Sequence, residues 1–216
     1  MRLRSPLQEV IDTVTFPLRA LAFFHRDRWG LSSLATERFD YVAREARGFR
    51  LDVCCGRHDR FVREFLGGRG RGIDVFPYEG LATDQVLPDL NRFPFPDASF
   101  AAVTFIANLN HVPAPLRDAE LAEAWRCLEP GGNIVVTMGN PLSEVLVHWL
   151  VGLHDRVLGT RIDVDGERGM GKGEAYYLTD TEITDRLHRA GLRGVTKRSF
   201  VTQWGLNHLL VGWKPY

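Results

Sequence analysis

The stretch Leu51-Asp-Val-Cys-Cys-Gly-Arg-His-Asp-Arg-Phe61 decides the fold of this 216-residue chain. It reads as a short apolar strand, a tight turn at Gly56 and the start of a helix. A strand that turns directly into a helix presents backbone N–H groups and a helix N-terminus to a ligand at the carboxyl edge of a sheet. Asp52, at the end of the predicted strand, can accept a hydrogen bond from a ligand ammonium or from a bound water.

A second predicted strand, Gly72-Ile-Asp-Val-Phe76, contains an acid at its end. This residue, Asp74, follows the first turn by about 20 residues, where a carboxylate can bind both hydroxyl groups of a ribose. Two classes of protein share these features, the dinucleotide-binding Rossmann unit and the S-adenosylmethionine-binding fold. These two stretches alone leave both classes open.

The core of the chain alternates between strand and helix patterns. Short apolar runs bounded by Gly, Asp or Pro predict buried parallel strands, at Phe49–Val53, Gly72–Val75, Phe100–Phe105 and Asn133–Met138. Helical patterns at Asp59–Leu66 and Leu116–Leu128 fall between them, which favours a doubly wound α/β fold. A capping box at Thr179 predicts a helix that Gly191 ends. Two last strands are predicted at Gly194–Phe200 and Asn207–Trp213.

The first 48 residues predict a helical lead-in. Ser5, Pro6 and Gln8 form a helix start, and Pro17 is expected to bend or split that helix. After the core, the pattern predicts an apolar helix at Pro141–Leu158 and a glycine-rich loop at Gly159–Gly173. We therefore expect one domain made of four parts: a helical cap (1–48), a cofactor-binding core (49–138), an insertion that shapes the acceptor pocket (139–173) and a C-terminal helix with a strand pair (174–216).

Composition excludes several classes of function. Lys plus Arg equal Asp plus Glu at 27 each, so the chain lacks the surplus of positive charge typical of nucleic-acid binding proteins. Three cysteines, Cys54, Cys55 and Cys127, match neither a disulfide framework nor a metal site, which predicts a cytoplasmic protein without a metal. No signal peptide is expected, and no apolar run reaches the length of about 20 residues that a transmembrane helix needs.

Four stretches together resemble the class I S-adenosylmethionine-dependent methyltransferases. The first turn is similar to the family signature, an aspartate followed by Gly-x-Gly-x-Gly, except that Cys54 and His58 stand where the family has glycine. Three later stretches resemble the family's third motif, the loop after its fourth strand and the turn into its fifth strand, at Asp89-Leu-Asn-Arg-Phe-Pro-Phe-Pro-Asp97, Leu109-Asn-His-Val112 and Glu129-Pro-Gly-Gly-Asn-Ile-Val-Val136. Four matches in the family's order are far more specific than any one of them.

The resemblance implies a Rossmann-like, seven-stranded, mostly parallel sheet with helices on both faces, and S-adenosylmethionine as the cofactor. The implied cofactor-binding residues are Asp52, Cys54, Gly56 and His58 in the turn, Asp74, Val75 and Phe76 at the ribose, Asp89 and Leu90 at the adenine, and Ile106, Ala107 and Asn108 at the methionine side. His111 is a candidate general base, with a structural role as the alternative. For His58 two arrangements are open: the side chain points outward or contacts the cofactor, or it narrows the pocket.

The expected reaction is direct displacement, in which a small-molecule acceptor takes the cofactor's methyl group with the help of orientation and desolvation. The neutral net charge and the aromatic residues of the cap favour an uncharged or lipophilic acceptor. One alternative is a catalytically inactive methyltransferase-like binding or scaffold protein, which a bulky His58 in the pocket would favour. The other is a nicotinamide-dependent oxidoreductase, against which the motifs at Asp89–Asp97 and Glu129–Val136 argue.

Overall fold

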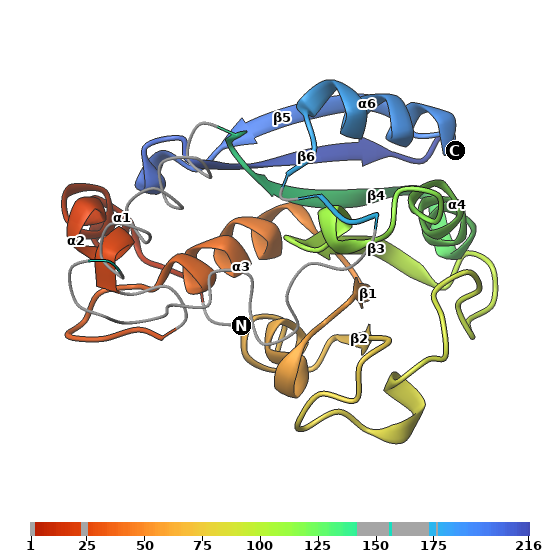
Figure 1. Ribbon diagram of the computed structural model, residues 1–216, viewed down its shortest axis with the longest axis horizontal. Coiled ribbons are helices and arrows are strands. Elements are labelled where there is room, and N and C mark those ends of the chain that lie inside the picture. The colour runs from red at the N-terminus through yellow and green to blue at the C-terminus, as the bar shows by residue number, and fades with distance from the viewer. Residues whose placement is uncertain (1–2, 23–25, 142–155, 157–172, 176) are drawn as a thin grey trace.

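Six strands form one sheet in a computed structural model that describes residues 3–22, 26–141, 156, 173–175 and 177–216 (Figure 1). The strand order is β2-β1-β3-β4-β6-β5. The strands are β1 (Arg50–Val53), β2 (Gly70–Ile73), β3 (Phe100–Ile106), β4 (Leu128–Gly139), β5 (Arg193–Ser199) and β6 (Asn207–Trp213). The first four are parallel, and β6 runs antiparallel to both β4 and β5. The predicted doubly wound α/β fold is confirmed, with six strands in the described part of the chain where seven were expected.

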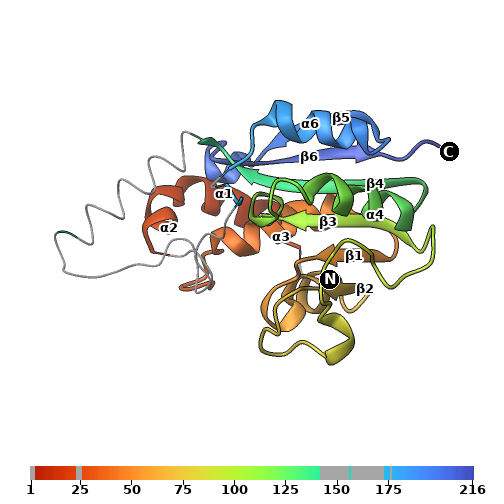
Figure 2. The ribbon, with the colours of Figure 1, turned by 45° about the vertical axis from the view of Figure 1, so that its right-hand side comes forward.

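Helices cover both faces of this sheet (Figure 2). One face packs against α4 (Arg117–Cys127) and α6 (Asp180–Arg189), and the other against α3 (Leu34–Glu45) and a wide helical turn, η2 (Phe61–Phe65). Successive residues of a strand point to opposite faces. In β3, Val103 and Phe105 accordingly join the first core cluster while Ala102 joins the second. Burial on both faces explains why β3 and the central part of β4 are apolar at nearly every position.

Local sequence signals fix several helix ends. The Thr179 side chain accepts the Glu182 N–H at the start of α6, as the capping box predicts. Ser5 caps α1 (Pro6–Val14) in the same way, and the lead-in helix is split before Pro17, because α2 (Phe16–Ala22) begins after Thr15. The predicted helix and loop of the insertion fall almost entirely outside the described residues. No described helix is both long and apolar enough to cross a membrane.

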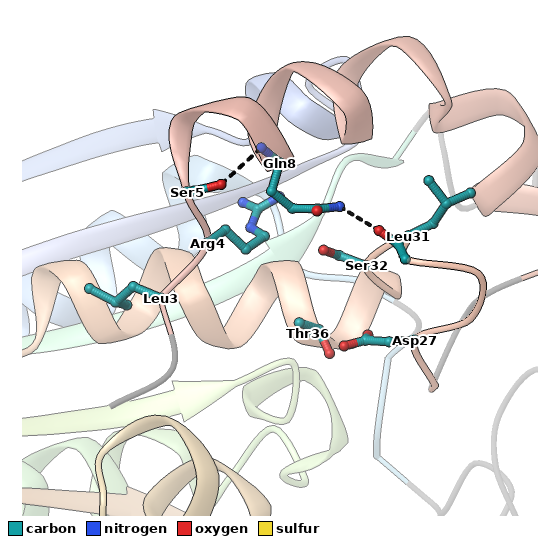
Figure 3. Close-up of a pocket in the computed structure, with 9 residues that line it drawn as sticks. Leu3, Arg4, Ser5, Gln8, Asp27, Leu31, Ser32 and Thr36 are labelled. Carbon is teal, nitrogen blue, oxygen red and sulfur yellow. Dashed lines mark hydrogen bonds between the residues drawn. The ribbon is translucent and has the colours of Figure 1, made fainter.

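A buried cluster of charged residues fastens the first two helices to α3. Arg4 Nη1 lies 2.6 Å from Glu37 Oε1 and 3.0 Å from Asp12 Oδ2. The Arg19 side chain is fully buried, with Nη1 3.0 Å from Glu37 Oε2 and Nη2 donating to the Asp12 carbonyl at 2.6 Å. Gln8 extends the network by donating to the Gly30 carbonyl, across a cavity beside α1 (Figure 3). This cap therefore depends on paired charges as well as on apolar packing.

Replacing Arg19 by methionine is expected to lower the free energy of unfolding by about 3–5 kcal/mol, because Asp12 and Glu37 would stay buried with one cation fewer. Urea denaturation followed by circular dichroism measures the change. The control is Arg28→Met in an exposed turn, which should change the free energy of unfolding by less than about 0.5 kcal/mol. Equal stability of the two variants would contradict a structural role for the buried cluster.

Candidate active site

A cavity of about 520 Å³ lies at the carboxyl edge of the sheet, where the chain leaves β1, β2 and β3. Its volume falls in the range of small-molecule sites. Its walls combine apolar side chains with a few polar groups: Cys54, Gly56, Arg57, Asp74, Val75, Phe76, Tyr78, Pro88, Asp89, Leu90, Ile106, Ala107, Asn108, His111, Val112, Pro113, Leu116 and Glu120.

The turn after β1 has an unusual backbone. Gly56 has φ 67° and ψ −164°, a conformation that is essentially restricted to glycine. Cys54 has φ 55°, in the left-handed region that costs a non-glycine residue roughly 1–2 kcal/mol. Both positions thus have backbone conformations that favour glycine, although only one of them carries glycine.

Asp74 connects the turn after β1 to the loop after β2. Its two carboxylate oxygens accept the backbone N–H groups of Gly56 and Phe76, each at 3.0 Å. A carboxylate offers about four acceptor positions, so the side chain keeps capacity for two further donors. A ribose presents two adjacent hydroxyl groups, and Asp74 lines the cavity where they could donate.

The wall beside Asp74 is mainly apolar. Val75, Phe76 and Leu90 line it, and the rings of Phe76 and Tyr78 lie 5.8 Å apart. Asp89 borders the same wall, and its Oδ1 accepts the Asn91 N–H at 2.9 Å. Such a surface suits a flat aromatic base such as adenine.

Two residues predicted to bind the cofactor do not line the cavity. Asp52 lies beneath it, where the Thr104 hydroxyl donates to Oδ1 at 2.6 Å. Burial raises the pKa of Asp52 well above its usual range, against the effect of that hydrogen bond. His58 has φ 59°, and its side chain is 55% exposed with Nε2 3.8 Å from Glu79 Oε2. The imidazole therefore points outward and leaves the cavity open.

Two oxygen atoms in the cavity wall have no protein partner among the described residues, Asn108 Oδ1 and Glu120 Oε2. Asn108 follows Ala107, whose φ is 53° and whose N–H donates to Thr137 Oγ1 at 2.9 Å. The Asn108 amide group donates to the Val53 carbonyl, which fixes its oxygen as the remaining acceptor. Glu120 projects from α4 and is only 5% exposed.

His111 also borders the cavity, in a short turn after β3. Its Nδ1 lies 3.3 Å from Oε2 of Glu174, a side chain that is itself buried. A carboxylate at one ring nitrogen orients an imidazole and stabilises its protonated form. The pair could accept a proton from a bound nucleophile.

The structure thus brings together all the predicted cofactor-binding residues except Asp52 and His58, with His111 beside them. Their roles toward a ligand stay predictions. Sequence reasoning missed Arg57, Tyr78, Pro88, Val112, Pro113, Leu116 and Glu120. For Glu120 a signal existed, because Leu116, Ala124 and Cys127 form an apolar stripe at helical spacing that this acid interrupts.

A family model described as a methyltransferase domain matches residues 24–197. The chain belongs to this methyltransferase family. The mitochondrial 2-methoxy-6-polyprenyl-1,4-benzoquinol methylase of Drosophila melanogaster is 34% identical over 114 residues, which are 47% of this chain and 35% of that protein. A ubiquinone/menaquinone biosynthesis C-methyltransferase of Brucella anthropi is 30% identical over 158 residues, 68% of this chain and 56% of that protein. The chain therefore matches between one third and just over half of the length of these two relatives.

Solved methyltransferase structures share the fold. One is the 1,6-didemethyltoxoflavin-N1-methyltransferase of Burkholderia thailandensis, solved with bound 1,6-didemethyltoxoflavin and S-adenosylhomocysteine. It matches with a TM-score of 0.56 at 16% identity, and the match covers 100% of this chain and 93% of that protein. A S-adenosylmethionine-dependent methyltransferase of Methanosarcina mazei has a TM-score of 0.55 at 19% identity and covers 81% of this chain and 97% of its own length. At such identities the likeness supports a common fold only.

S-adenosylmethionine is the cofactor of this methyltransferase family, and the cavity of this chain fits it. Asp74 offers acceptors for ribose hydroxyls, and Phe76 and Leu90 offer an apolar wall for adenine. Within the described part of the chain, Asn108 Oδ1 and Glu120 Oε2 are acceptors without donors. An ammonium group, which carries donors only, is complementary to them.

Replacing His58 by glycine is expected to leave the affinity for S-adenosylhomocysteine unchanged within about twofold, because the exposed imidazole lies outside the cavity. Isothermal titration calorimetry on both proteins measures this. A gain of tenfold or more in the glycine variant would mean that the imidazole swings into the cavity and obstructs it.

Proposed function

We propose that the chain is an S-adenosylmethionine-dependent methyltransferase that acts on a small molecule at the cavity beside Asp74. The observation that carries this proposal is the convergence of Cys54, Gly56, Asp74 and Asn108 on one cavity at the carboxyl edge of the sheet. The family match and the cavity's fit to the cofactor support it independently.

When bound, the cofactor supplies a methyl group on a positively charged sulfur, which a nucleophile can displace. The protein's part is to hold the cofactor and the acceptor in line and to keep water out, which accounts for much of the rate enhancement of such reactions. Asp74 and its backbone donors would fix the ribose, while Ile106, Ala107 and Val112 would enclose the reacting end. The acceptor pocket would be completed by the helical cap (residues 1–48) and by the insertion (residues 139–173).

His111 is the proposed general base for an acceptor that must lose a proton. Glu174, 3.3 Å from Nδ1, would stabilise the imidazolium formed in that step. Proton transfer by a positioned side chain contributes typically 10²–10⁴-fold to a rate. Carbon, nitrogen and oxygen nucleophiles all fit this role, since each carries a proton that must leave.

The acceptor proposed is an uncharged, lipophilic small molecule. Apolar side chains beyond the predicted adenine wall support this, because Val112, Pro113 and Leu116 line the same cavity. Two relatives, named as a polyprenyl-benzoquinol methylase and a ubiquinone/menaquinone biosynthesis C-methyltransferase, support the same chemistry. Methyl transfer from labelled S-adenosylmethionine to short-chain benzoquinols tests the assignment. Methylation of charged acceptors in preference to these quinols would contradict it.

A scaffold protein without catalytic activity is the weaker alternative. Its main support was a His58 side chain in the pocket, whereas that side chain is exposed.

All three cysteines are free thiols, in keeping with the cytoplasmic setting that we propose.

Replacing Asp74 by asparagine is expected to weaken binding of S-adenosylhomocysteine by about ten- to a hundredfold, because hydrogen bonds from the ribose to a charged acceptor would be lost. Calorimetric titration of both proteins measures the effect, with thermal unfolding as a check that the variant folds. Failure of the unaltered protein to bind either S-adenosylmethionine or S-adenosylhomocysteine would overturn the proposed function.

A further inference from the structure

The Glu120 carboxyl group occupies an unusual place. It is 5% exposed, lines the cavity, and its Oε2 has no partner among the described residues. A buried polar atom without a partner lowers the stability of the folded protein, so such an atom calls for an explanation in function. Asn108 Oδ1, in the same cavity wall, is a second acceptor without a donor. A ligand that brings several N–H donors would satisfy both.

Asp52 does not fill this role. In the sequence it occupies the position expected to bind a ligand ammonium, yet its carboxyl group is buried below the cavity against Thr104. Glu120 instead comes from α4 and lines the same cavity as Cys54, which belongs to the turn after β1. A carboxyl group from a different element thus shares the cavity with that turn.

We propose that Glu120, together with Asn108, binds the α-ammonium group of the cofactor in the place that the sequence assigns to Asp52. The proposal rests on the proposed function, because it assumes that the cavity holds S-adenosylmethionine. An ammonium group has three donors and no acceptor, which matches two acceptors that lack donors. Glu120 then acts in binding and takes no part in the transfer itself.

The ionisation of Glu120 gives the proposal a distinctive signature. Burial raises the pKa of Glu120 to about 8, so most of the ligand-free protein carries the neutral acid at pH 7. A bound ammonium favours the carboxylate and lowers this pKa, so binding should release a proton. Affinity should accordingly rise as the pH increases toward 8. The other titratable groups of the cavity are Cys54, Arg57, Asp74, Tyr78, Asp89 and His111.

Two probes separate the ammonium site from the rest of the cavity. S-adenosylhomocysteine carries the amino-acid part, whereas 5′-methylthioadenosine lacks it. In Glu120→Gln we expect binding of S-adenosylhomocysteine to weaken by about tenfold or more, while 5′-methylthioadenosine keeps its affinity within about twofold. Calorimetry in phosphate and in Tris at pH 7.5 measures proton release, expected for S-adenosylhomocysteine with the unaltered protein and absent in the variant.

Two further variants make the test selective. Asp118→Asn removes an exposed carboxylate from the same helix and should bind both probes as the unaltered protein does. Asp52→Asn compares the two candidate carboxyl groups directly. A selective loss of S-adenosylhomocysteine binding in Asp52→Asn, or none in Glu120→Gln, would overturn the assignment. Failure of both probes to bind the unaltered protein would instead reject the proposed function.

A second, independent observation concerns the outer surface of the first two helices. Leu7 and Val14 are 70% and 73% exposed, and Val10 and Leu18 are exposed beside them. Val201 and Trp204 extend this outer face, since the indole N–H of Trp204 donates to the Thr13 carbonyl at 2.9 Å. The inner side of the same helices holds the buried charges described above. An ordinary surface helix buries its apolar side and exposes its polar side, whereas these two helices do the reverse. Such an exposed apolar surface indicates an interaction site.

The border of the outer face suits one partner. Among residues 3–20 and 26–36, the exposed charged residues are Arg26 and Arg28, whereas the acidic residues are buried or half-buried. Trp29, in the same turn as these arginines, is 80% exposed. Apolar side chains flanked by arginine and tryptophan are typical of surfaces that bind the interface of an anionic membrane. We propose that the outer face binds the surface of an anionic lipid bilayer.

Cosedimentation with vesicles tests this proposal. The protein should bind phosphatidylglycerol–phosphatidylcholine vesicles more tightly than pure phosphatidylcholine, and Val10→Asp with Val14→Asp should weaken binding by about tenfold or more. Tyr216→Asp, an exposed aromatic residue elsewhere, is the matched control. Absence of vesicle binding would reject the proposal. A dimer that the double variant dissociates, without vesicle binding, would assign the face to a second copy of the chain.

Discussion

The site depends on one carboxylate that ties two loops together. Asp74 accepts backbone N–H groups from the turn after β1 and from the loop after β2, and its own backbone pairs with Gln85 and Leu87. Hydrogen bonds to an ionised acceptor are stronger than neutral ones. The edge of the cavity is therefore built before any ligand arrives, and a ligand need not supply the energy to order it.

Residues with left-handed backbones follow β1 and β3 near the cavity, and hydrogen bonds hold two of them in place. The His58 N–H donates to the Glu79 carbonyl at 2.7 Å, and the Ala107 N–H donates to Thr137. Because these bonds fix the backbone, the chain can carry side chains where the family has glycine. At His58 the side chain points to solvent, and at Cys54 it is small enough to line the cavity. Left-handed backbone conformations thus occur here at residues other than glycine.

The strands, the helix caps and most cavity residues could be predicted from the sequence, because they depend on local patterns. Apolar runs predicted β1 to β3 within two residues at each end, whereas the fourth predicted strand began five residues after the start of β4. Thr179 marked the start of α6. The directions of side chains could not be predicted in this way. Asp52 lies between Leu51 and Val53, and only the pairing of β1 with β3 places it against Thr104. For Glu120 the local pattern shows only an acid that interrupts the apolar stripe of α4. Its position in the cavity wall depends on how α4 packs against distant segments, which the local pattern does not encode.

The charge around the cavity argues for a cationic ligand. Burial raises the pKa values of the Cys54 and Cys55 thiols, and the carboxyl groups of Asp52 and Asp74 raise them further. Both thiols stay protonated at neutral pH, which removes the thiolate that redox chemistry requires. Asp74 and Glu120 both line the cavity and both raise the pKa of Cys54, and they would stabilise an ammonium group once Glu120 is ionised. One electrostatic environment thus disfavours cysteine chemistry and favours the cofactor of a methyltransferase.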